Sequence, residues 1–153
     1  ESDDKLLVVY SDGNYEITDQ ELTQKIDAEK VIHIGKFNPE KIVTAVYVDN
    51  AKKEFIVKRF KIETTTLKTK FMFIKEGNGN YVETITTDEE PVLAVQQGRG
   101  EQVRKGKFKI TKLAEVMGWK AVGTKLVDFS KSVQMEWVRP KPSADDGQPE
   151  LFG

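Results

Sequence analysis

The segment from residue 91 to residue 112 constrains the fold more than any other part of the chain. It begins with an apolar run at residues 92–95 and passes through a glycine-containing turn into a polar strand. In that strand apolar and basic residues alternate with the period of two that is typical of a half-buried β-strand. Phe108 and Ile110 fall on one face, and the opposite face carries Lys107, Lys109 and Thr111. The segment therefore predicts a hairpin with an apolar inner face and a basic outer face.

The same plan recurs earlier in the chain. Apolar strands that start near Leu6, Ile42 and Val92, roughly 36 and 50 residues apart, each lead through a Gly, Asn or Asp turn into a returning strand. A loose period in this range is typical of propeller blades. A single Greek-key barrel or sandwich is the alternative, and periodicity alone does not exclude it. Further strands are expected at residues 31–34, 70–75, 81–87, 127–129 and 133–137.

Length and composition favour one domain with a tail. The chain has 153 residues, of which 38% are hydrophobic and 32% charged, as expected of a small β-domain with much exposed surface. We expect a folded domain at residues 1–138. Residues 139–153 are rich in proline and acidic residues and too poor in apolar ones to fold alone, so they predict a disordered tail. Because the chain starts at Glu1 rather than at methionine, we expect it to be part of a longer protein.

Charge is distributed in blocks along the chain. The net charge of −1 by itself argues against a nucleic-acid-binding protein. However, residues 51–75 hold eight bases and two acids, and residues 98–125 also hold eight bases and two acids. Each block carries a charge of +6, whereas residues 1–30, with nine acids and three bases, carry −6. A surface can therefore be basic although the whole chain is not.

No catalytic or metal-binding pattern is found. The chain has no cysteine, and His33 is its one histidine, so neither a zinc site nor a His-based triad is expected. The acidic run at residues 88–90 precedes a proline and is typical of a solvated turn. Nucleotide-binding loops and hydrolase motifs are absent. No apolar run approaches the length of a membrane span. We therefore expect no enzymatic activity, no metal and no cofactor in this fragment.

Several phrases of the sequence resemble a known family. They are NPEKIVTAVYVDNAKKEFIVKRFKI at residues 38–62, GRGEQVRKG at 98–106, GWKAVGTKL at 118–126, and the acidic tail. Together they resemble the C-terminal domain of the A subunit of a type IIA DNA topoisomerase, in the gyrase A-like form that topoisomerase IV has in Bacteroidetes. The resemblance spans nearly the whole chain but includes no catalytic signature.

The resemblance implies both a fold and a function. It implies an all-β fold, a partial β-pinwheel of about three hairpin blades in an open arc. It implies a non-catalytic domain that binds and bends double-stranded DNA within an ATP-dependent type II topoisomerase, an isomerase. The implied partners are the ATPase subunit of the topoisomerase and the remainder of its A subunit. The implied location is cytoplasmic and nucleoid-associated. Residues 96–100, Gln-Gln-Gly-Arg-Gly, are only a faint echo of the gyrase box that wraps DNA, which favours bending over wrapping.

Candidate DNA contacts come from the basic strands. Lys and Arg side chains supply sequence-independent affinity by displacing counterions from phosphates. The turn at residues 98–100 could offer backbone N–H groups to a phosphate or be a plain glycine-rich hairpin. Trp119 could stack on a base, although packing in the core is the favoured interpretation. The candidate residues are Lys58, Arg59, Lys61, Arg99, Arg104, Lys105, Lys107, Lys109, Lys112 and Lys120.

The tail suggests an alternative function. Residues 148–152, Gln-Pro-Glu-Leu-Phe, resemble the peptide with which bacterial proteins dock on the replication sliding clamp. Gln148 would be the polar anchor, and Leu151 and Phe152 the apolar ones. The alternative is therefore a protein-interaction module for a replication or chromosome-organisation partner.

Overall fold

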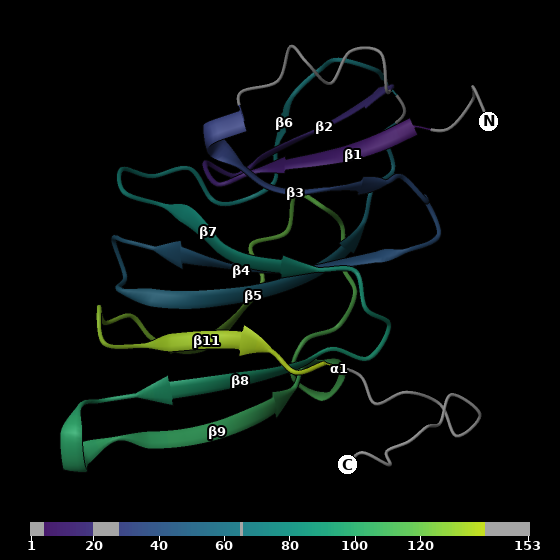
Figure 1. The fold of residues 1–153 in the computed structure, drawn as a ribbon. Coiled ribbons are helices and arrows are strands. Elements are labelled where there is room, and N and C mark those ends of the chain that lie inside the picture. Colours follow the sequence, from purple (N-terminus) through teal and green to yellow (C-terminus); the bar gives the residue numbers. More distant parts are fainter. Residues whose placement is uncertain (1–4, 20–27, 65, 140–153) are drawn as a thin grey trace, which may run out of the picture.

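The computed structural model describes residues 5–19, 28–64 and 66–139, which form three antiparallel β-sheets stacked face to face (Figure 1). The all-β prediction is confirmed, since one short α-helix and two 3-10 turns are the helical elements described. The elements are β1 (Lys5–Tyr10), β2 (Asn14–Asp19), η2 (Ala28–Lys30), β3 (Val31–Lys36), β4 (Ile42–Asp49), β5 (Glu54–Lys61), β6 (Phe71–Met72), β7 (Tyr81–Thr86), β8 (Val92–Gln97), η3 (Gly100–Gln102), β9 (Arg104–Lys109), α1 (Ile110–Leu113), β10 (Thr124–Asp128) and β11 (Gln134–Trp137).

Each sheet is built around one of the three predicted hairpins. The first sheet has the strand order β3-β1-β2-β6, the second β10-β5-β4-β7 and the third β11-β8-β9. Strands are exchanged between sheets, because the chain leaves β5 to add β6 to the first sheet and then returns to add β7 to the second. Near the end of the described chain, β10 joins the second sheet and β11 the third. This exchange confirms the pinwheel prediction.

The second sheet is covered on both faces, which explains why β4 and β5 are almost continuously apolar. Successive side chains of a strand point to opposite faces. The first core lies against the first sheet and includes Val43, Tyr47 and Phe60. The second core lies against the third sheet and includes Val48 and Phe55. Within the described residues neither core joins the first sheet to the third, so the stack is open, as predicted.

Two local predictions are corrected by the structure. The strand expected at residues 70–75 is reduced to the two residues of β6, because Phe73 and Ile74 are buried at the sheet boundary without a strand partner. The basic strand ends at Lys109, and Ile110 begins α1. Ile110 is nevertheless fully buried in the second core together with Phe108, so the predicted inner face is confirmed.

The turn between β8 and β9 depends on one glycine. Gly98 has φ +88°, and a Cβ placed there would lie 2.5 Å from the carbonyl oxygen of Gln102. We predict that Gly98→Ala lowers the free energy of unfolding by about 2 kcal/mol, because left-handed backbone and a backbone contact are both unfavourable for alanine. The matched control is Gly118→Ala, where a Cβ meets nothing within 4 Å. Urea unfolding measures both variants, and equal midpoints would contradict the prediction.

Candidate nucleic-acid interface

The strand β9 is an edge strand whose register fixes where its side chains point. It pairs with β8 so that Leu93 lies opposite Phe108 and Ala94 opposite Lys107. Directly opposed residues of an antiparallel pair share a face. Leu93 is fully buried and packs with Phe108 in the second core. The alternate positions must therefore point away from the core, and these carry the lysines.

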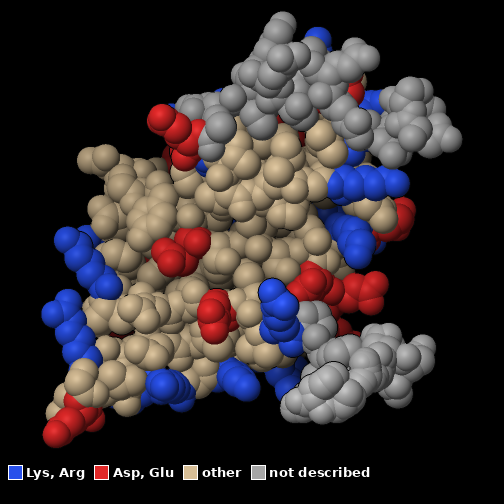
Figure 2. All heavy atoms as spheres, viewed as in Figure 1, with Lys and Arg blue, Asp and Glu red and all other residues tan. Residues whose placement is uncertain are grey.

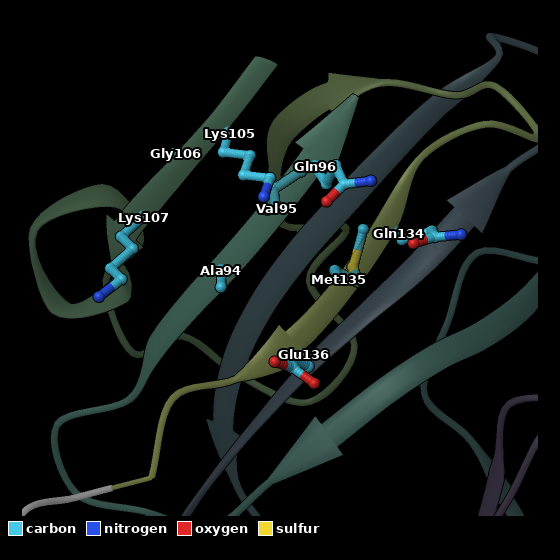
Figure 3. A pocket seen from close by; sticks show the side chains of 9 residues that line it. All are labelled: Ala94, Val95, Gln96, Lys105, Gly106, Lys107, Gln134, Met135 and Glu136. Atoms are coloured by element: carbon cyan, nitrogen blue, oxygen red, sulfur yellow. The ribbon is translucent and has the colours of Figure 1, made fainter. Parts of the chain in front are cut away.

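We call the side of the third sheet that points away from the second core the outer face. The register of β8 with β9 and with β11 assigns to it Lys105, Lys107, Lys109, Ala94, Gln96, Gln134 and Glu136. Because Ala94 is small, the middle of this face is hollowed into an open trough of about 570 Å³. Figure 3 shows the labelled lysines, glutamines and Glu136 around it. The arrangement is a polar, mostly cationic surface rather than an enclosed ligand cavity.

The cations of β9 are available for binding. Arg104, Lys105, Lys107 and Lys109 are all exposed, and no ion pair within the described residues involves any of them. Figure 2 shows Lys and Arg side chains spaced along the lower edge of the molecule, where Figure 1 places β9. Two residues of strand span about 6.7 Å, so the three lysines form a regular row. Arg104 starts the strand on the opposite alternation but is exposed at its end.

The adjoining turn is a plain hairpin rather than an anion nest. Arg99 has extended backbone with φ −139° and ψ 152°, between two glycines of positive φ. A nest requires successive N–H groups in alternating right- and left-handed helical conformations, which this turn does not have. Gln102 N donates to the carbonyl of Arg99 at 2.9 Å and closes the turn. Arg99 is exposed, so its guanidinium remains a candidate contact, as does exposed Lys112 in α1.

Two predicted contacts are wrong. Lys58 is 3% exposed and Arg59 6% exposed. The Lys58 ammonium donates to the carbonyl oxygens of Phe73, Trp119 and Ala121 and lies over the ring of Phe60. Burial lowers its pKa to about 8. Arg59 donates to Thr44 Oγ1 at 3.3 Å and points into the second core, where burial lowers its pKa. Neither side chain is accessible to a phosphate.

Lys61 and Lys120 lie away from the outer face. Lys61 ends β5 in the second sheet, and its Nζ is 3.9 Å from a carboxylate oxygen of Glu40. Lys120 lies over the ring of Trp119, 5.3 Å from its centroid. Trp119 packs edge-on against Tyr15 at 5.9 Å, in the first core. Its role is core packing, the interpretation that the sequence favoured, and it is not positioned as a stacking platform for a base.

A second group of cations was missed by sequence reasoning. Lys52 and Lys53 are exposed in the turn between β4 and β5, and exposed Lys131 lies between β10 and β11. Phe129 N donates to the Lys53 carbonyl at 2.8 Å, which holds these two connections together. Figure 1 places them on the same edge as the turn between β8 and β9, and Figure 2 shows Lys and Arg side chains along that edge. The signal in the sequence was the run of lysines at residues 52–53.

The other residues considered from sequence are structural where they are described. Tyr10, Tyr15 and Tyr47 are each at most 1% exposed, which confirms their predicted packing, whereas Tyr81 is 38% exposed. In the described part of the chain no three His, Cys, Asp or Glu side chains gather into a possible metal site. No helix of the described residues is long and apolar enough to cross a membrane. The proposed clamp contacts Gln148, Leu151 and Phe152 lie outside the described residues.

The fold and the basic edge together define a class of protein, the topoisomerase C-terminal β-pinwheels. The chain is similar to the crystal structure of the C-terminal domain of DNA topoisomerase IV, with a TM-score of 0.66 and 16% identity. The match covers 92% of this chain but 49% of that structure, so the chain spans about half its length. No curated protein matches the sequence. Residues 1–134 match the family model for the topoisomerase C-terminal domain of Bacteroidota, and the chain belongs to that family.

Proposed function

We propose that this domain binds duplex DNA through phosphate contacts, independently of sequence, and performs no chemistry itself. The supporting observation is the row of exposed cations on β9 that pair with no acid among the described residues. Exposed lysines contact phosphates without reading base edges. The proposed partners are double-stranded DNA, the ATPase subunit of the topoisomerase and the remainder of its A subunit. The domain would act at the nucleoid and would need no cofactor of its own.

The second group of cations supports bending of the duplex. A duplex that lies along β9 and also reaches Lys52, Lys53 and Lys131 must follow an edge shared by the second and third sheets. Smooth bending of a site of 20–30 base pairs by 40–90° costs about 1–6 kcal/mol, which additional phosphate contacts offset. The basic edge thus favours bending around the domain.

The proposal is tested by fluorescence anisotropy with two duplexes of equal length and unrelated sequence. Six cations belong to the third sheet, its turn and α1, namely Arg99, Arg104, Lys105, Lys107, Lys109 and Lys112. Six phosphate contacts predict a loss of affinity of about 10³-fold between 50 and 200 mM salt. We expect the two duplexes to differ by less than about threefold. Binding that ignores salt, or that strongly prefers one sequence, would contradict the proposal.

The terminal peptide supports a second candidate function. A net charge of −1 is unusual for a domain that only binds nucleic acid, and residues 148–152 provide two apolar anchors at the chain end. We propose the sliding clamp as its partner. A clamp pull-down with the wild-type chain should be positive and should be lost when Leu151 and Phe152 are both replaced by alanine. Equal recovery of the two proteins would remove this candidate.

A further inference from the structure

A cleft separates the first and second sheets where the chain crosses from β3 to β4. Its volume is about 360 Å³, and it is lined from both sheets. Pockets that hold small molecules typically measure about 300–1,000 Å³, so the cleft has room for one small group. It lies outside the outer face and outside the set of proposed DNA contacts.

The floor of the cleft is apolar. It is made by Leu7 of β1, Val43 of β4 and Ile62, which directly follows β5. These three side chains are 4%, 2% and 4% exposed and belong to the first core. Phe37 packs against the same core and also lines the cleft. An apolar group that enters the cleft would therefore contact both sheets at once and remove hydrocarbon surface from water.

The walls of the cleft carry polar and cationic groups. His33 lies opposite Val9, a residue of the first core, so the imidazole is on the inner side of the first sheet. Burial lowers the pKa of His33, which keeps the ring neutral at pH 7 with one N–H to donate. A Cβ at Gly35 would lie 3.4 Å from His33 Nε2, so glycine leaves the ring its space. Lys41 is exposed at the cleft and has no ion pair within the described residues.

We propose that this cleft binds a small organic anion with an apolar body. The apolar body would lie on Leu7, Val43 and Ile62, and the anionic group would pair with Lys41 and accept the His33 N–H. Both carboxylates and phosphate monoesters have this chemistry. The inference does not depend on DNA binding. Because the ligand would contact both sheets, it would stabilise their packing by mass action.

His33 provides a specific probe of the site because it is the one histidine of the chain. Its imidazole proton signals can be followed by NMR while the protein is titrated with phenylacetate or phenyl phosphate, which separates the carboxylate from the phosphate. We expect a saturable shift with at least one of them. Benzyl alcohol, which lacks the charge, and acetate, which lacks the ring, should each bind at least about tenfold more weakly.

A variant pair separates this site from general attraction of anions. Lys41→Glu should weaken binding of the anion at least about tenfold, since an ammonium beside the ligand becomes a carboxylate. Lys68→Glu makes the same charge change at an exposed residue outside the cleft and should leave the affinity unchanged. The proposal is overturned if neither anion shifts His33 saturably up to about 10 mM. It is equally overturned if both variants bind the anion alike.

Discussion

Replacing Lys105, Lys107 and Lys109 together by glutamate is expected to lower the affinity for duplex DNA by about 10²–10³-fold at 50 mM salt. Each change removes one attraction to a phosphate and adds one repulsion, and each such pair is worth about 1 kcal/mol at contact in water before screening. All three side chains lie on the outer face and are exposed. Their replacement leaves no buried group without a partner. Fluorescence anisotropy with a duplex labelled at one end measures the loss.

The matched control carries the same change in net charge elsewhere. Lys30, Lys41 and Lys68 are exposed and lie outside the third sheet. Their joint replacement by glutamate should reduce the affinity by less than about threefold, through long-range repulsion alone. Circular dichroism should show that both variants keep the β-structure of the wild type. Equal losses in the two variants would mean that net charge, rather than the outer face, determines binding.

The largest loss of stability is expected for Lys58→Met, at about 3 kcal/mol. The ammonium donates to the carbonyl oxygens of Trp119 and Ala121, each at 2.6 Å, and to that of Phe73. Methionine keeps much of the side-chain volume but donates nothing, so three buried acceptors lose their donor. Lys61→Met is the matched control on the same strand, at an exposed position, and should change the free energy of unfolding by less than about 0.5 kcal/mol. Urea unfolding compares the two, and similar losses would contradict the buried role of Lys58.

The same residue predicts a pH dependence of stability. Burial lowers the pKa of Lys58 from 10.5 to about 8. Between these values the unfolded chain holds more protons than the folded one, so the contribution of Lys58 to stability rises with pH. Burial raises the pKa of Tyr47 from 10.0 to about 12, which has the opposite effect above pH 10. We therefore expect the contribution of Lys58 to rise from pH 8 to pH 10 in the wild type and to be absent in Lys58→Met. Identical pH profiles would contradict this assignment.

The hairpins were predictable because their determinants are local. A turn such as Asp12–Gly13 between apolar runs, and the alternation at residues 104–110, define strands without knowledge of the rest of the chain. The outer face follows from the same alternation, because Phe108 must face the core and its neighbours then cannot. That part of the candidate site was readable from sequence and is placed as expected by the register with β8.

The error at Lys58 and Arg59 has a physical cause. In a sheet with one solvated face, charged residues mark the solvated side. The second sheet has cores on both faces, so Lys58 points into the first core and Arg59 into the second. The pattern held a warning, since Lys58 has the same alternation as Ile56 and Phe60, which were assigned to an apolar face. An even-numbered lysine on that face had to be buried or the face exposed.

The exchange of strands between sheets could not be read from local patterns. The chain places β6 beside β2, and β10 beside β5, through pairings of residues more than 50 positions apart. Such pairings depend on which sheet edges remain open once the hairpins have formed. The shared edge of the turn lysines and the cleft beside His33 are products of that stacking. For this reason neither was foreseen.

The salt dependence of duplex binding tests the central claim most directly. Six phosphate contacts predict that the logarithm of the association constant falls with the logarithm of salt concentration with a slope of about −5. Replacing Lys105, Lys107 and Lys109 by alanine should make this slope shallower by about 3, equally for duplexes of unrelated sequence. A slope that is the same in the wild type and the triple alanine variant would show that the outer face of the third sheet does not contact DNA.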